Sequence, residues 1–423
     1  MAHEIGVWLF EQPVGTLSME SGRLIFQYRH DWLDHPNAIA LSQSLPLGPE
    51  RFDDHQCRAF FAGLLPEGNL RRLIARQCQV SSQNDFALLS AIGGECAGAI
   101  TLLPARQPMI TDKHTEVEWL DERQFVDLLE ELPRRPMLAG RDGIRLSLAG
   151  AQDKLPVVFD GNRIGLPMGT QPSTHILKPP IAAVEGSVMN EAFCLALTKA
   201  MNMPTAEGQV FQVKDRQVLL VARYDRRVGE EGQPVRVHQE DFCQALGVAP
   251  EMKYQNEGGP DLKACFDLLR RATRPSAPQV LRLLDAVAFN ALVGNHDAHA
   301  KNFSLLYGAE SMAKGPTLAP LYDLLCTAVY DQLSPKMAMK LGSKYKFTEV
   351  QAQHWDQFAQ AAGLSKAQTK KRVLRIAQDL PDAARQLQAL PLFSNQPIVA
   401  KIVALIERRS ALTTRRLFGP GEA

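Results

Sequence analysis

The pattern of apolar and polar positions changes along the chain. The N-terminal part holds short apolar runs such as IGVWLF, VGTLSM and LIFQY, separated by the turn-forming stretches EQP and ESGR, which predicts strands. Helical spacing follows around CRAFFAGLLPEGNLRRLIARQ, and we expect it to break or restart at Pro66 because proline does not continue a helix. The linker-like stretch PARQPMITDKH indicates a domain boundary near residue 106.

Between residues 144 and 224 the pattern is mixed. IRLSL, LPVVFD, THILK and QVLLVARY are typical of strands, and NEAFCLALTKAMN has its apolar residues at helical spacing. After about residue 240 the chain is mostly helical, and APQVLRLLDAVAFNALVGN predicts one continuous helix. We therefore predict an α+β chain with a β-rich part at 1–106, a mixed part at 107–240 and a mostly helical part at 241–423.

Length and composition exclude several classes of protein. A chain of 423 residues is too long for one small core, and 45% apolar with 22% charged residues is ordinary for a globular protein. The net charge of +1 indicates neither a nucleic-acid partner nor a membrane surface. The N-terminus lacks a signal-peptide pattern, and no apolar run approaches the ~18 residues that span a bilayer.

Cysteine usage indicates a reducing compartment. The seven cysteines are scattered and none forms a Cys-x-x-Cys pair, which argues against a disulfide framework or a zinc ribbon. We expect a cytoplasmic protein.

The stretch GNHDAHAKNFSLLYG carries the strongest chemical signal. Four residues separate Asp297 from Asn302, NFSLLY reads as a strand, and LAPLYD reads as its returning partner. In such a hairpin Asn302 and Asp323 would be neighbours, and with Asp297 they would form an oxygen-rich site of the kind that Mg²⁺ prefers. In kinase-like phosphoryl transfer one Asp orients the attacking hydroxyl, while an Asn and a later Asp hold the metal.

Two other interpretations of this loop stay open or are disfavoured. A capped helix end with a solvated loop remains open. A zinc site is disfavoured because His296 and His299 do not form His-Glu-x-x-His and no third ligand is evident. We expect His299 to brace the loop by hydrogen bonding.

Candidates for nucleotide binding lie earlier in the chain. Lys178 ends the predicted strand THILK and could point at phosphates, unless it is a solvated charge. Glu191, which we place at the beginning of the next helix, could pair with it as a helix glutamate does in protein kinases. The alternative is an acidic residue that favours a first helical turn.

The stretch SLAGAQDK is the candidate phosphate loop. Its small residues Ala149, Gly150 and Ala151 would let backbone N–H groups approach an anion. It has one glycine and matches neither common phosphate-binding glycine motif, so a plain turn with an exposed Ser147 stays open. Residues 222–224 leave a predicted strand and could offer backbone groups to adenine, unless they are only a strand end.

Several stretches together resemble the HipA family of bacterial serine/threonine kinase toxins. They are RLSLAGAQDK, THILKPP, NE, ARYDR, QEDFCQALG, KYQNEGGP, DAHAKNFSLL and LAPLYDLL, in the family's order, with the N-terminal FFAGLLPEGNLRR. The resemblance implies a two-lobed protein-kinase-like fold that binds ATP and Mg²⁺. It implies that Asp297 is the catalytic base, that Asn302 and Asp323 are metal ligands, and that Ser147 is autophosphorylated. The nucleotide-binding residues that it implies are Ala149, Gly150, Ala151, Gln152, Asp153, Lys154, Lys178, Ala222, Arg223, Tyr224, His299 and Asp323.

The resemblance also implies partners. They are a HipB-like helix-turn-helix antitoxin, operator DNA reached mainly through that antitoxin, and an aminoacyl-tRNA synthetase, glutamyl-tRNA synthetase, as substrate. At the expected hinge Ala222 replaces an acidic residue, which changes little if the contact is through backbone. Two alternatives remain: a small-molecule kinase, since DAHAKN also resembles the aminoglycoside phosphotransferase loop, and a catalytically weak co-repressor.

Overall fold

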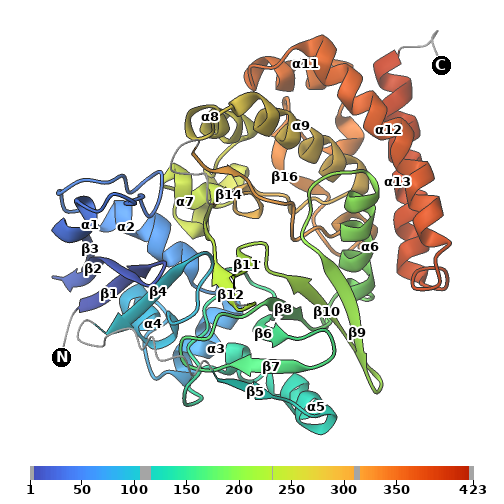
Figure 1. Cartoon of the computed structure of the whole chain (residues 1–423). Helices are drawn as coiled ribbons and strands as arrows, with labels where there is room; N and C mark the ends of the chain where they lie inside the picture. Colours follow the sequence, from blue (N-terminus) through green and yellow to red (C-terminus); the bar gives the residue numbers. More distant parts are fainter. Residues whose placement is uncertain (1–3, 105–115, 231, 309–314, 419–423) are drawn as a thin grey trace. The chain divides into compact units, whose positions relative to one another are not determined.

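The computed structural model describes residues 4–104, 116–230, 232–308 and 315–418 (Figure 1). The chain forms two compact units. Unit 1 comprises Met1–Pro179, Phe211–Pro250 and Leu305–Ala313, and unit 2 comprises Pro180–Val210, Glu251–Ser304 and Lys314–Ala423. The boundary predicted near residue 106 lies outside the described residues.

Unit 1 begins with a four-stranded antiparallel sheet of order β3-β2-β1-β4 (dark blue and blue-green in Figure 1). Its alternate residues Ile5, Val7 and Leu9 are buried, as the two-residue period of a strand requires. The predicted helical break at Pro66 is confirmed, because one helix ends before it and the next begins after it. The elements of this part are β1 (Glu4–Leu9), β2 (Gln12–Glu20), β3 (Arg23–Tyr28), α1 (His30–Leu33), α2 (Asp54–Phe61), η1 (Ala62–Leu64), α3 (Gly68–Gln77), α4 (Asp85–Ile92) and β4 (Ile100–Pro104).

A second sheet of order β5-β7-β6-β8-β10-β9 follows, with a small hairpin of β11 and β12. The predicted strands LPVVFD, THILK and QVLLVARY are confirmed as β6, β8 and β10. The elements are β5 (Val117–Trp119), α5 (Glu122–Glu131), η2 (Pro136–Leu138), β6 (Leu155–Phe159), β7 (Ile164–Pro167), β8 (His175–Lys178), β9 (Gly208–Val213), β10 (Arg216–Ala222), β11 (Arg226–Val228), β12 (Pro234–Arg236), β13 (His238–Asp241), α7 (Phe242–Leu246) and η3 (Pro250–Met252).

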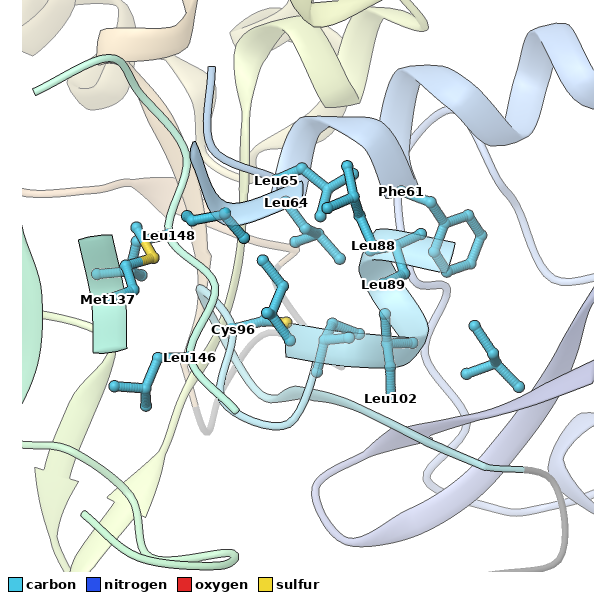
Figure 2. Packing of buried hydrophobic residues seen from close by; sticks show 14 of the residues in the cluster. Phe61, Leu64, Leu65, Leu88, Leu89, Cys96, Leu102, Met137, Leu146 and Leu148 are labelled. Atoms are coloured by element: carbon cyan, nitrogen blue, oxygen red, sulfur yellow. The ribbon is translucent and has the colours of Figure 1, made fainter. Parts of the chain in front are cut away.

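The predicted strand IRLSL is wrong. Residues 144–148 form only an isolated parallel bridge, in which Leu146 pairs with Glu95. Leu146 and Leu148 nevertheless pack into the core of unit 1 beside Leu64 and Cys96 (Figure 2). This segment therefore reads as a strand because its apolar residues alternate, although it joins no sheet.

Unit 2 is mostly helical. The predicted continuous helix is confirmed as α9, which packs against α8, α12 and α13. Its elements are α6 (Ser187–Ala200), η4 (Gln255–Glu257), α8 (Leu262–Ala272), α9 (Ser276–Val293), η5 (Ala300–Asn302), β14 (Ser304–Tyr307, which continues into unit 1), β15 (Thr317–Leu318), η6 (Thr327–Val329), β16 (Lys336–Leu341), β17 (Lys344–Lys346), η7 (Phe347–Glu349), α11 (Ala352–Ala361), α12 (Lys366–Gln388) and α13 (Pro397–Phe418).

The predicted α+β class, with a β-rich N-terminal part and a mostly helical C-terminal part, is confirmed. Within the described ranges, no helix combines the length and the apolar character that crossing a membrane requires.

Candidate active site

The loop after α9 keeps Asn302 next to Asp297. Gly294 ends the helix with φ +85°, and a Cβ there would lie 2.8 Å from the Cβ of Ala328, so the position requires glycine. The Asp297 N–H donates to Asn295 Oδ1 (3.1 Å), and Asn302 Nδ2 donates to the Asp297 carbonyl (2.9 Å). The main chain at Asp297 is therefore held on both sides.

Asp323 follows a tyrosine that contacts the end of this loop. The Tyr322 hydroxyl donates to the Lys301 carbonyl (2.8 Å) and lies 2.7 Å from Ser304 Oγ. These bonds place the Asp323 segment beside Asn302. Asp323 has φ +56°, a left-handed conformation that is uncommon outside glycine and clusters at functional sites.

The predicted hairpin is wrong in its detail. Asn302 ends a 3₁₀ turn instead of starting β14. The returning strand covers only two residues, because Pro320 has no N–H to donate and Leu321 bonds with the backbone of residues 204–206. Strands β14 and β15 do pair, with the Ala319 N–H donating to the Ser304 carbonyl (2.8 Å), but the pair ends before Asp323. The hydrogen bonds of Tyr322 extend the contact to the Asp323 segment.

A buried threonine fixes the main chain just before Asp297. Thr327 Oγ1 accepts the His296 N–H (2.8 Å) and donates to the Gly294 carbonyl (3.2 Å). The His296 carbonyl in turn accepts the N–H of Ala338 on β16 (2.7 Å). Two separate segments therefore bond to the backbone of His296.

Arg409 of α13 also reaches the loop. Its Nη1 donates to the Ala291 carbonyl (2.6 Å), its Nη2 lies 2.9 Å from His296 Nε2, and its guanidinium stands 4.4 Å from the Phe347 ring centroid. His296 Nδ1 donates to the Ser334 carbonyl (3.2 Å), so Nε2 accepts and the imidazole is neutral. Burial and the Arg409 charge lower the pKa of His296 to about 4.

Asn190 on helix α6 binds the backbone shortly after Asp323, the candidate metal ligand. Asn190 is fully buried, and its Oδ1 accepts the Cys326 N–H (2.8 Å) while its Nδ2 donates to the Cys326 carbonyl (3.0 Å) and the Tyr330 hydroxyl (3.1 Å). A side-chain amide that pairs with both groups of one residue fixes the backbone there. This clamp lies three residues after Asp323.

The two charged candidates for phosphate binding are both buried. Lys178 ends β8 as predicted and is 6% exposed, which disfavours a simple solvated charge. Glu191 is 4% exposed and lies in the second turn of α6, not at its beginning, because the helix starts at Ser187. The two residues belong to different units, and their pairing stays a prediction.

The candidate phosphate loop closes around its own lysine. Lys154 Nζ donates to the Ala149 carbonyl (2.7 Å), and a Cβ on Gly150 would lie 2.6 Å from that nitrogen. Gly150 has φ +111°, and its carbonyl accepts the Glu67 N–H (3.0 Å). The single glycine of the stretch therefore stands where a side chain does not fit.

The other residues of this loop differ in burial. Ala151 is exposed, and Gln152 and Asp153 are partly buried. Asp153 Oδ1 is buried with no hydrogen-bond partner in the described ranges, and burial raises the pKa of this carboxyl.

Ser147 is fully buried, so the alternative of an exposed serine on a turn is wrong. Its Oγ donates to the Leu64 carbonyl (2.8 Å) and its N–H donates to the Glu95 carbonyl (2.9 Å). Leu146 and Leu148 on either side face the core (Figure 2). A kinase cannot reach this hydroxyl while the segment stays in place.

Part of the expected hinge, residues 222–224, already takes part in a strand and in hydrogen bonds within the protein. Ala222 ends β10, and the Arg223 N–H donates to the Thr174 carbonyl (3.0 Å). The hydroxyl of Tyr224 donates to Gln239. The Arg223 side chain is 1% exposed, so this residue can offer only its backbone groups to a nucleotide.

A buried charge network explains the Arg223 side chain. Glu95 pairs with Arg223 (3.1 Å), Arg226 (2.6 Å) and Arg236 (2.6 Å), and Asp225 pairs with Arg223 (2.7 Å). Burial raises the pKa of Glu95, but the three guanidiniums outweigh burial and hold it well below its usual range. The network joins residues before the candidate phosphate loop to residues after the second sheet.

Comparison with known proteins decides the family. A family model of the HipA-like C-terminal domain matches residues 146–384, more than half of the chain. The chain belongs to the HipA family. A second model, the HipA N-terminal domain, matches residues 5–103. The resemblance predicted from the sequence motifs is confirmed.

Relatives of this HipA chain are named as kinases. The protein Y4mE of Sinorhizobium fredii, named as a candidate kinase, is 45% identical over 390 residues, covering 90% of this chain and 91% of the relative. The serine/threonine-protein kinase toxin HipA of Shewanella oneidensis is 29% identical over 388 residues, covering 88% and 87%. The chain also matches the solved complex of Shewanella oneidensis HipA, HipB and operator DNA, with a TM-score of 0.84, 27% identity and 97% of each chain covered. These matches confirm the HipA kinase-like fold.

The oxygen donors of the site fit a magnesium ion. Mg²⁺ takes one or two protein oxygens and completes its shell with phosphates and water, and Asn302 and Asp323 offer such oxygens. In the part of the chain that the structure describes, no three His, Cys, Asp or Glu side chains converge on a common point. A metal at this site would therefore depend on phosphate oxygens for most of its ligands.

Several residues that contact the candidate catalytic loop are not predicted by the sequence analysis. The Tyr254 hydroxyl donates to Asp297 Oδ1 (2.7 Å), and its ring lies edge-on to His299 with centroids 5.2 Å apart. KYQNEGGP belongs to the family pattern, but its residue types alone do not indicate a role. Its two glycines were a usable signal for a tight turn that presents the tyrosine. Thr327 and Arg409 carry no such signal.

Proposed function

We propose that this HipA-family chain is an ATP- and Mg²⁺-dependent serine/threonine protein kinase that acts as the toxin of a toxin–antitoxin pair. The observation that carries the proposal is a pair of hydrogen bonds: Asn302 donates to the Asp297 carbonyl, and Tyr322, the neighbour of Asp323, donates to the Lys301 carbonyl. Asp297 accepts the proton of a serine or threonine hydroxyl, and general-base assistance of this kind contributes about 10²–10⁴-fold in rate. Asn302 and Asp323 hold Mg²⁺ against the nucleotide.

The nucleotide is held by groups from several segments. The N–H groups around Ala149, Gly150 and Ala151 approach the phosphates, and Lys178 supplies a cation. Gln152, Asp153 and Lys154 complete the phosphate loop, while His299 and the backbone of residues 222–224 contact the rest of the nucleotide. ATP supplies the phosphoryl group, and Mg²⁺ neutralises the charge that develops on it.

We also propose that Ser147 is autophosphorylated and that this inactivates the kinase. Its burial requires the segment to leave the core first, so the reaction takes place from an undocked segment or between two molecules. A phosphate adds about −1.5 to −2 charges and does not fit beside the Leu64 carbonyl. The modified segment therefore stays out, and the phosphate loop that continues from it is lost. Ser147→Ala should bind ATP and remain toxic, whereas Ser147→Asp should bind ATP poorly.

Mass spectrometry after incubation with MgATP tests the switch directly. If phosphate is found on other residues but never on Ser147, this part of the proposal fails.

The partners follow from the relatives. The matching structure of Shewanella oneidensis holds HipA with HipB and operator DNA, and we propose a HipB-like helix-turn-helix antitoxin for this chain, with operator DNA bound mainly through it. A hollow on α12, lined by Lys370, Lys371, Arg372 and Arg375, is a candidate surface for such acidic or nucleic-acid partners. We propose an aminoacyl-tRNA synthetase, glutamyl-tRNA synthetase by family resemblance, as the substrate in the cytoplasm.

The deciding experiment compares the wild type with Asp297→Asn and Asp323→Ala. We expect Asp297→Asn to bind MgATP but to lose phosphotransfer to glutamyl-tRNA synthetase. We expect Asp323→Ala to lose the Mg²⁺-dependent part of ATP binding, measured by titration calorimetry, and to stop growth inhibition on overexpression. Asp356→Asn, an exposed change on α11, is the control. Wild-type turnover in Asp297→Asn would remove this residue from the role of base.

A further inference from the structure

Tyr254 contacts the carboxylate to which we assign the role of base. Its hydroxyl donates to Asp297 Oδ1 over 2.7 Å, and the ring is flanked by His299. A hydrogen bond to an ionised carboxylate is stronger than one between neutral groups and has a defined direction. The contact therefore limits how the carboxylate turns about its Cβ–Cγ bond.

The turn that carries Tyr254 holds the ring in place. The N–H groups of Glu257 and Gly259 both donate to the Tyr254 carbonyl (3.0 and 2.9 Å). Gly258 has φ +96°, and a Cβ on Gly259 would lie 2.1 Å from the Met252 carbonyl oxygen. Both positions require glycine, so the pair in KYQNEGGP closes the turn and returns the tyrosine to the catalytic loop.

Strand β16 bonds to both the turn and the loop. Gln255, the next residue in the turn, accepts the Lys340 N–H with its Oε1 (2.7 Å). Two residues earlier on the strand, the Ala338 N–H donates to the His296 carbonyl (2.7 Å), next to the base. One strand thus sets the position of the tyrosine and of the aspartate.

Given a catalytic base at Asp297, we propose that Tyr254 is a positioning residue that fixes the rotation of this carboxylate. With Oδ1 bonded to Tyr254, the plane of the carboxylate is set before the substrate arrives, and the attacking hydroxyl meets it in one orientation. The hydroxyl proton passes to Asp297 as the oxygen bonds to the γ-phosphorus and ADP leaves, while Tyr254 keeps its own proton. Preorganisation of this kind acts on the rate of the chemical step and not on nucleotide binding.

A different role for the same contact has the opposite consequence. A tyrosine on a mobile turn would occupy the place of the substrate hydroxyl, and its removal would raise the rate. The closed glycine turn and the bond to β16 favour the fixed role.

Tyr254→Phe removes the hydroxyl and keeps the ring. The readouts are MgATP turnover with water as the acceptor and phosphate incorporation into the chain itself. We expect kcat to fall by about 10- to 100-fold, the range of a lost hydrogen bond to a charged group. We expect the KM for ATP, the Kd for MgATP and the melting temperature to stay unchanged. Tyr345→Phe, which removes the hydroxyl of a partly buried tyrosine on β17, is the matched control and should behave as the wild type.

A double variant separates this proposal from the assignment of the base. With Asp297→Asn inactive, adding Tyr254→Phe should cause no further loss, because both changes act on one group. If Asp297→Asn is inactive while Tyr254→Phe turns over as the wild type or faster, the positioning role is wrong and the base stands. If Asp297→Asn keeps its activity, the proposed function itself fails at that residue.

Discussion

The segment around Ser147 and the loop around Asp297 are both irregular, and they are held in different ways. The first is fastened by backbone hydrogen bonds to Glu95 and Glu67 and by leucines in the core. The second is fastened by side chains that come from separate elements, among them Thr327 and Arg409. Backbone bonds to one neighbouring part are lost together in a local opening, whereas bonds from several elements oppose any single opening. The first segment is suited to release and the second to a fixed geometry.

We expect the largest effect from neutralising the carboxylate of Glu95, a residue whose carbonyl binds the segment around Ser147. Glu95→Gln leaves Arg223, Arg226 and Arg236 buried without their shared carboxylate. Loss of one partner of a buried ion pair typically costs about 3–5 kcal/mol. We expect a loss of this size in the free energy of unfolding of unit 1, measured by urea denaturation, together with weaker MgATP binding.

Glu118→Gln is the control for this change. It removes a half-exposed pair with Arg141, which is worth about 1 kcal/mol or less. Equal losses in the two variants would show that the buried network is not what fastens the segment.

The second effect is a pH response of opposite sign from two buried groups, Glu240 and His296. In unit 1, burial raises the pKa of Glu240 from 4.5 to about 7, although Ser42 and Tyr307 donate to it. Between these values the unfolded chain has lost a proton that the folded chain keeps, so stability falls as pH rises. In unit 2, the lowered pKa of His296 means that the unfolded chain binds a proton that the folded chain does not, so stability falls as pH drops from 6.5 to 4.

Each group contributes at most about 3 kcal/mol. Amide hydrogen exchange measured unit by unit from pH 4 to 7 checks the two signs. In unit 1 burial also lowers the pKa of His238 to about 4, which opposes the effect of Glu240. Glu240→Gln should therefore give unit 1 a response of the same sign as that of unit 2 and should leave unit 2 unchanged. If the wild type does not lose stability relative to Glu240→Gln between pH 4.5 and 7, the assignment to Glu240 is wrong.

The sequence predicted the elements whose signal is local. Helix α9 and the strands β6, β8 and β10 follow from apolar periodicity, and the Asp-x₄-Asn spacing places the polar loop directly after α9. Residues 144–148 were mistaken for a strand because periodicity does not report whether a partner strand exists. The hairpin failed at Pro320, where Leu321 bonds with residues 204–206, more than a hundred positions earlier.

The residues that hold the site in place could not be predicted from the sequence, for a related reason. Arg409 and Asn190 act through contacts across long stretches of chain, and an isolated arginine or asparagine in a helix carries no local signal. Ser147 lies in a recognisable motif, but its burial depends on the Leu64 carbonyl of the N-terminal part. Tyr254 belongs to the family motif KYQNEGGP, but the motif does not indicate its contact with Asp297.

The third prediction tests whether the second loop depends on side-chain bonds. Thr327→Val keeps the shape of the side chain but removes the bonds to His296 and Gly294 and leaves a buried N–H without its acceptor. We expect about 1–3 kcal/mol lower stability and a lower kcat, with nucleotide affinity retained. Thr327→Ser keeps the hydroxyl and is the matched control. A loss of kcat in the serine variant equal to that in the valine variant would show that the hydroxyl bonds of Thr327 are not the cause of the loss.

The smallest expected effect concerns the glycine of the phosphate loop. Gly150→Ala places a Cβ 2.6 Å from Lys154 Nζ at a φ of +111°, so the lysine must leave the Ala149 carbonyl or the loop must open. Gly161→Ala, in the turn between β6 and β7, has a similar φ of +99° and nothing within 4 Å of the added Cβ. Both variants carry the backbone strain of about 1–2 kcal/mol, but only the first disturbs the loop. We expect MgATP affinity, measured by calorimetry, to fall in Gly150→Ala and to stay at the wild-type level in Gly161→Ala. If both variants bind MgATP equally well, the conformation of Gly150 has no part in nucleotide binding, and the loop would have to contact phosphate from a different arrangement.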